Sequence, residues 1–133
     1  MTDILDTRTG YGHFERVAVP VWATGHGSAA FLACADSALA AQLRLDDGRL
    51  YASCVEARCR MHREVAPGNP LDTGLRVIEL GTASVRFELG LFHPGEEKPA
   101  ASACLALVLV DRVSGKPAPI PADLRSRLEA MKA

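Results

Sequence analysis

This 133-residue sequence has almost no excess of one charge sign over the other, and it has few aromatic residues. Its 15 Lys and Arg are matched by 16 Asp and Glu, giving a formal net charge of −1, and only 5% of the residues are aromatic. A chain without a basic excess cannot neutralise many phosphates or bind an acidic lipid surface strongly. We therefore expect neither a nucleic acid nor a membrane as partner.

Long hydrophobic runs are missing as well. No stretch approaches the roughly 20 apolar residues of a membrane span. The first 16 residues include Asp3, Asp6 and Glu15 and no apolar run, unlike a secretory signal. The sequence predicts a cytosolic protein.

The cysteines are few and scattered, at Cys34, Cys54, Cys59 and Cys104. In the cytosol this usage indicates buried thiols without disulfides. Cys54 and Cys59 are five residues apart on one predicted strand, where alternate side chains point to opposite faces, so they cannot chelate a metal ion together. No glycine-rich phosphate loop or dinucleotide fingerprint is present. We expect no metal site and no cofactor.

Apolar residues make up 48% of the chain, enough for the core of one domain spanning residues 1–133. Alternating apolar and polar residues, bounded by Gly and Pro turns, predict a first strand over 14–22 and four more over 51–65, 71–80, 83–93 and 101–111. The last four are expected to form an antiparallel meander. Leu124, Leu128 and Met131 have the spacing of a short amphipathic helix that lies on the sheet.

One long helix is predicted over residues 28–43, with Ser28 as N-cap. It is alanine-rich and apolar on nearly every face, so it must be covered all round. Its small side chains would let a sheet close around it. The predicted fold class is α+β.

The order of elements resembles the hotdog fold, a long antiparallel sheet wrapped around one central helix, as in acyl-CoA thioesterases of the 4-hydroxybenzoyl-CoA thioesterase superfamily. Three stretches carry the resemblance: the Gly25-His26 turn, the turn and strand over 65–77, and the segment 109–121. The resemblance implies an acyl-CoA substrate and a homodimer or homotetramer that shares sites across its interface.

The turn from Gly25 to Ser28 is the predicted site of catalysis. Unpaired backbone N–H groups at a helix start can stabilise the oxyanion that develops during thioester hydrolysis. Gly27 would let the carbonyl approach the backbone closely, and the resemblance places the acyl thioester here. The alternative is a flexible connection without a ligand.

Asp36 is the predicted general base or nucleophile. Relatives whose turn ends in Gly-His carry an aspartate four residues before the histidine, where this chain has Trp22. Another branch, the phenylacetyl-CoA pathway thioesterases, resembles the chain in placing a carboxylate on the helix, one residue earlier than Asp36. Asp36 is also the one charged residue between Gly27 and Leu43, and a buried carboxylate is usually paired or functional. The alternative is a structural role at a dimer seam.

Other residues of the turn are expected to assist. His26 could orient the substrate or relay a proton, although a lone histidine in a turn is often structural. Thr24 could hydrogen-bond the water or the carbonyl. Trp22, Gly25 and Ser28 are the expected substrate-binding residues of the turn, and Ser28 is equally explained as an N-cap.

A basic row is predicted where Arg58, Arg60 and His62 share one face of a strand. In an acyl-CoA enzyme this row could contact the nucleotide phosphates, with Arg63 and the 112–116 turn as further candidates. The alternative is a solvated strand face on which Glu56 and Glu64 are ion-pair partners.

The function predicted from the sequence is hydrolysis of acyl-CoA thioesters to a free acid and CoA. Two alternatives stay open: a carrier-protein thioesterase without an acidic base, and a non-catalytic acyl-binding protein. A hydratase is disfavoured because no paired Asp/His motif is present.

Overall fold

The computed structural model describes residues 8–18, 39, 43, 45, 48–64 and 70–132. The described elements are the 3-10 helix η1 (Arg8–Gly10), the strands β1 (His13–Ala18), β2 (Leu50–Met61), β3 (Pro70–Leu80), β4 (Ser84–Phe92) and β5 (Ala101–Asp111), and the helix α2 (Ala122–Ala130). All strands pair antiparallel, so the α+β class is confirmed. Among these elements, no helix has the length and apolarity needed to cross a membrane.

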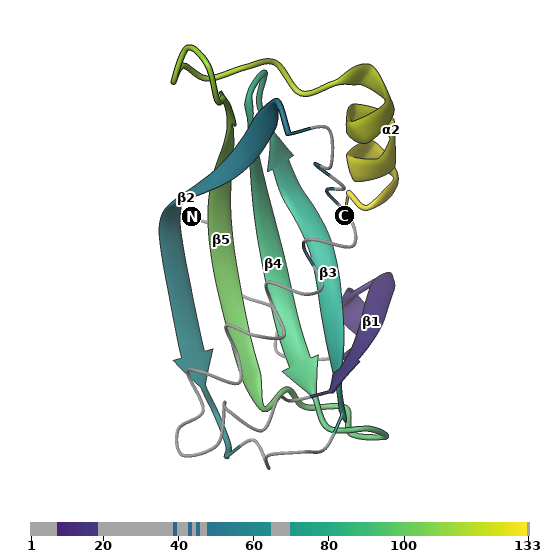
Figure 1. Ribbon diagram of the computed structural model, residues 1–133. Helices are drawn as coiled ribbons and strands as arrows, with labels where there is room; N and C mark the ends of the chain where they lie inside the picture. The colour runs from purple at the N-terminus through teal and green to yellow at the C-terminus, as the bar shows by residue number, and fades with distance from the viewer. Residues whose placement is uncertain are drawn as a thin grey trace.

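The strands form one sheet in the order β1-β3-β4-β5-β2 (Figure 1). The predicted meander is right for β3, β4 and β5 but wrong for β2, which pairs with β5 at the far edge. The connection over 62–69 can span up to about 26 Å. It must cross three strand spacings, about 14 Å, so its length permits this crossover.

β2 is shorter than predicted because the carbonyl of Ala100 ends its ladder. This oxygen accepts from the backbone N–H of both His62 (2.8 Å) and Arg63 (3.1 Å). The register of β2 also shifts between Cys54 and Glu56, a β-bulge. Two bulged residues opposing one partner residue bend a strand and change which residues share a face.

One face of the sheet, here called the inner face, carries the hydrophobic core. Its buried members from the three central strands are Leu71, Leu75, Val77, Val85, Phe87, Leu89, Leu91, Ala101, Ala103, Leu105, Leu107 and Leu109. The opposite, outer face carries the alternate residues, among them Asp72, Arg76 and Glu88. The inner face therefore supplies most of the burial that stabilises the fold.

Two residues of the predicted long helix are described, and both support its placement in the core. Leu39 and Leu43 are helical and buried, and they belong to the inner-face cluster. The other residues over 28–43 lie outside the described part of the chain.

The predicted C-terminal helix is α2, and it packs beside the end of β3 (Figure 1). Leu124 and Leu128 are buried in the core cluster. Beyond the helix, the carbonyl of Met131 accepts from the N–H of Val77 (3.0 Å), and Arg127 Nη2 donates to the carbonyl of Leu43 (3.4 Å). Leu43 therefore lies at the α2 end of the sheet.

Candidate functional site

The predicted catalytic segment lies outside the described residues, with Trp22, Thr24, Gly25, His26, Gly27, Ser28 and Asp36. The structure describes the two points between which this segment runs. Ala18, the last residue of β1, pairs with Pro70 of β3. Leu39 is buried in the inner-face core. The segment therefore follows a strand paired with β3 and leads to a helical residue buried in the inner-face core.

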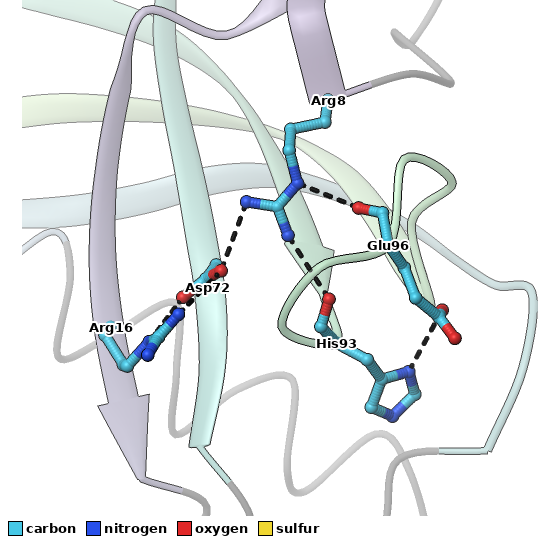
Figure 2. Close-up of polar contacts among 5 residues, drawn as sticks. All are labelled: Arg8, Arg16, Asp72, His93 and Glu96. Carbon is cyan, nitrogen blue, oxygen red and sulfur yellow. Dashed lines mark hydrogen bonds and ion pairs between the residues drawn. The ribbon is translucent and has the colours of Figure 1, made fainter.

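A buried carboxylate anchors the first of these ends. Asp72 lies two residues after Pro70, on the outer face of β3, opposite Arg16 of β1. Arg16 Nε donates to Oδ1 (2.7 Å) and Nη2 to Oδ2 (3.2 Å), while Arg8 Nη1 donates to Oδ2 (3.1 Å; Figure 2). Such charge-assisted bonds are stronger than neutral ones. They attach β1, two residues before its end, to β3.

Arg8 extends this anchor to the turn between β4 and β5. Its Nε donates to the carbonyl of Glu96 (2.8 Å) and its Nη2 to that of His93 (3.2 Å; Figure 2). The guanidinium carbon lies 5.1 Å from the ring centroid of Phe14 and 4.8 Å from that of Phe92, within range of cation–π attraction. One side chain therefore connects η1, β3 and the β4–β5 turn.

The charge state of the Asp72 carboxyl suits it to holding β1 and η1 against β3 and not to donating a proton. The hydrogen bond from Arg16 lowers the pKa of this carboxyl, the hydrogen bond from Arg8 lowers it further, and partial burial opposes them. Asp72 is therefore ionised at neutral pH. The sequence analysis did not identify it, although an aspartate directly after Leu71, at the start of a predicted strand, is a signal that could have drawn attention.

An aromatic cluster covers part of the outer face beside this anchor. Tyr11 packs against Phe14 and Phe92 in edge-to-face geometry and lies over Gly74 and Gly90. A Cβ atom at Gly90 would lie 3.0 Å from the Tyr11 ring, so glycine is required for this close approach. Burial raises the pKa of the Tyr11 hydroxyl, and it stays neutral.

Thr73 is a second residue that the sequence analysis missed. It lies between Leu71 and Leu75 on the inner face and is fully buried. Its hydroxyl oxygen Oγ1 has no hydrogen-bond partner in the described part of the chain. An unsatisfied buried hydroxyl costs about 1–3 kcal/mol.

The structure brings the predicted basic row together on one face. Arg58 and Arg60 oppose Cys104 and Ser102 of β5, which are two residues apart and share the outer face. Both arginines are exposed. His62 Nε2 lies 2.8 Å from the hydroxyl of Ser102, so this histidine is held at the end of the row.

The further basic candidates are arranged differently. Arg63 donates to Glu96 Oε2 (2.8 Å), at the same end of the sheet as His62. The 112–116 turn follows the other end of β5, roughly 30 Å from Ser102 at about 3.3 Å per residue. The two groups cannot contact one nucleotide diphosphate together.

Two cysteine predictions are wrong. Cys54 and Cys59 are exposed and not buried, because they lie on the edge strand β2; Cys104 is buried as expected, and all three are free. The bulge after Cys54 also puts Cys54 and Cys59 on the same face, opposite Leu107 and Ala103. Four residues of separation along β5 is still about 13 Å, too far for shared coordination of one metal ion. Within the described ranges, no group of three or more His, Cys, Asp or Glu could hold a metal ion.

Comparison with known proteins relates this architecture to one family. The sequence profile of the Thioesterase-like superfamily matches residues 13–128. No curated protein sequence matches the chain.

Solved structures agree with the profile match. The PA5185 protein of Pseudomonas aeruginosa strain PAO1 is 28% identical, with a TM-score of 0.90 over 96% of each chain. A thioesterase from Thermus thermophilus, complexed with coenzyme A and Zn, is 24% identical, with a TM-score of 0.70 over 92% of this chain and 96% of that one. The YbaW Probable Thioesterase from Escherichia coli is 17% identical, with a TM-score of 0.70 over 90% and 98%. The last two support the fold alone.

Proposed function

Because the chain belongs to the Thioesterase-like superfamily and has its hotdog fold, we propose that it hydrolyses acyl-CoA thioesters to a free acid and CoA. The observation that carries the proposal is the extent of the profile match, which spans residues 13–128 and so includes the predicted turn and Asp36. The coenzyme A bound to the Thermus thioesterase supports CoA as the thiol that leaves.

In the proposed reaction the turn from Gly25 to Ser28 binds the thioester carbonyl. Backbone N–H groups of this turn donate to the carbonyl oxygen as negative charge develops on it. Gly27 has no side chain to obstruct the approach. The Asp72 anchor supports this step indirectly, because it fixes the strand from which the chain enters the turn.

Asp36 is the proposed general base. It takes a proton from a water molecule as the water oxygen attacks the carbonyl carbon. Collapse of the tetrahedral intermediate then breaks the carbon–sulfur bond, and CoA leaves as the thiol after receiving that proton. His26 and Thr24 are proposed to orient the water and the carbonyl, and Trp22 is proposed to contact the bound acyl thioester.

The exposed row on β2 is the proposed contact for the CoA phosphates. Arg58 and Arg60 present guanidinium groups that suit bidentate binding of phosphate oxygens. His62 is held at the end of the row by Ser102. We do not propose phosphate contacts for the 112–116 turn, since it lies at the opposite end of the sheet.

A carrier-protein thioesterase is the second candidate, and Trp22 is the observation that favours it. One branch of the relatives has an aspartate where this chain has Trp22. A mechanism that relies on the oxyanion site and a bound water does not use that aspartate, so it is compatible with Trp22. A non-catalytic acyl-binding protein would show binding without turnover.

A hydrolysis panel of short, long and aromatic acyl-CoAs, with Asp36→Asn beside the wild type, tests the proposal. A positioned base contributes about 10²- to 10⁴-fold, so kcat per folded protein should fall by that factor. Asp123→Asn, an exposed residue on α2, is the matched control and should keep full turnover.

The panel separates the alternatives by outcome. Full turnover in Asp36→Asn excludes Asp36 as base. Wild-type hydrolysis of an acylated carrier protein, without hydrolysis of any acyl-CoA, establishes the second candidate.

A further inference from the structure

Two free cysteines lie on β2, at the edge of the described sheet (Figure 1). Cys54 and Cys59 are exposed, and both belong to the inner face, opposite Leu107 and Ala103 of β5. They are about 13 Å apart along the strand, whereas the Cα atoms of a disulfide are at most about 6.8 Å apart. The two thiols of one chain therefore cannot form a disulfide with each other.

β2 offers a long edge on which a second copy of the chain can pair. It has 12 residues, and among the described strands its one hydrogen-bonded neighbour is β5. Two identical edge strands related by a two-fold axis pair antiparallel, so that residues at equal ladder distances from the axis oppose each other. The residue that lies on the axis therefore fixes the register.

The charges at the middle of β2 select one register. Glu56 and Arg58 are exposed and share the outer face, opposite Ala106 and Cys104 of β5, with Ala57 between them. An axis at Glu56 or at Arg58 would place two like charges directly opposite each other, which is destabilising. An axis at Ala57 instead places Glu56 of each copy opposite Arg58 of the other, and opposite charges in this position attract. The charge pattern therefore favours the axis at Ala57.

The same register brings the cysteines of two copies together. One ladder step from Ala57, Arg58 meets Glu56 of the second copy. The next step places Cys59 opposite Cys54 of the second copy, because the β-bulge leaves Val55 without a position in the ladder. Opposed residues of an antiparallel pair have Cα atoms about 4.5–5.5 Å apart, which is within the range of disulfides.

We propose that two copies of the chain pair through β2 with the two-fold axis at Ala57, and that Cys54 of each copy forms a disulfide with Cys59 of the other when a small disulfide oxidant is present. The inference goes beyond the proposed function and does not depend on it. Oxidation makes the dimer covalent, so the assembly of the protein responds to the redox state of its surroundings.

The disulfides form by thiol–disulfide exchange. A thiolate on β2 attacks the oxidant and releases one small thiolate, and the opposing thiolate then attacks the mixed disulfide and releases the second. The two protein thiols are oxidised, and their protons and electrons leave with the oxidant as two small thiols.

Cross-linking of the full chain with oxidised glutathione tests the register. Non-reducing electrophoresis and intact mass spectrometry should show a covalent dimer of twice the 14.2 kDa chain mass, joined by two disulfides. Cys54→Ser alone and Cys59→Ser alone should each give no covalent dimer. Co-expression of the two variants, one of them tagged, should give a covalent heterodimer with a single disulfide.

Two further variants identify the thiols. Cys104→Ser, which replaces a buried thiol on the outer face, is the matched control and should cross-link as the wild type does. Cys34→Ser is tested beside it, since Cys34 lies outside the described residues. If Cys34→Ser loses the cross-link, the disulfide uses that residue and the inference is wrong.

The remaining outcomes also decide the matter. A covalent dimer of either single variant, Cys54→Ser or Cys59→Ser, would mean that like cysteines meet, which contradicts an axis at Ala57. A wild type that becomes glutathionylated without a covalent dimer would overturn the inference, whether light scattering finds one chain or two.

Discussion

Asp72 shows how a single buried charge can organise one end of a sheet. Its carboxylate accepts three hydrogen bonds from two arginines, one on β1 and one on η1, and is only 7% exposed. The arginine donors compensate for the lost hydration of the carboxylate. The cluster therefore combines electrostatic and packing contributions at the entrance to the predicted catalytic segment.

Replacing Asp72 with Asn should lower the free energy of unfolding by about 1.5–3 kcal/mol at pH 7, the usual worth of hydrogen bonds to a charged group. The pKa of Asp72 is lowered in the folded state, so its stabilising effect is present above the unfolded-state pKa and is lost as pH falls through the folded-state pKa. Urea denaturation at pH 7 and in strong acid measures this.

The control for Asp72 is Glu79→Gln, since Glu79 is exposed and its nearest ion-pair contact is 3.9 Å from Arg86. This variant should change stability by less than about 0.5 kcal/mol. If Asp72→Asn lowers the free energy of unfolding as much in strong acid as at pH 7, the carboxylate charge is not what stabilises these contacts.

At the scale of elements, β2 is the longer of the two edge strands of the described sheet, with 12 residues against 6 in β1. It pairs with β5 alone among the described strands, and its residues from Cys54 to Met61 are all exposed. A long edge strand with unpaired backbone groups readily pairs with another chain. β2 is therefore the proposed contact between two copies of the protein.

Light scattering should give a mass of about twice, or about four times, the 14.2 kDa of one chain. Ala57→Lys places a charge in the middle of the proposed β2 contact, where two copies would put like charges close together, and should lower the mass to that of one chain. Val113→Lys, in an exposed turn beside the first residue of β2 and remote from Ala57, should leave it unchanged. A wild-type mass of one chain at micromolar concentration would exclude the dimer and any site shared across it.

At the scale of the whole molecule, one core joins the sheet, the helical Leu39 and Leu43, and α2. The C-terminal segment closes this core at the far end of β3 through Leu124 and Leu128. Because the same cluster includes residues from β2, β3, β4, β5 and α2, we expect the chain to unfold as one unit.

Leu128→Ala should lower the free energy of unfolding by about 2–5 kcal/mol, the range for removing a buried leucine side chain. Far-ultraviolet circular dichroism and the fluorescence of Trp22, the one tryptophan of the chain, should report the same lowered midpoint. Glu129→Ala, an exposed neighbour, should shift it little. Separate transitions for the two probes would contradict a single cooperative domain.

Sequence periodicity by itself predicted the strands and the terminal helix, because alternation and turn residues are local properties of the chain. The superfamily was indicated by the resemblance of three stretches and the order of elements. Periodicity could not place β2 beside β5, since strand order depends on long-range pairing and an eight-residue connection allows several arrangements. It also misassigned the face of Cys54, because a one-residue bulge reverses the parity that the sequence pattern assumes. Only the tertiary structure separated Asp72 from Thr73: the same strand places one side chain among arginines and the next among leucines, so among the described residues the first polar group is satisfied and the second is not.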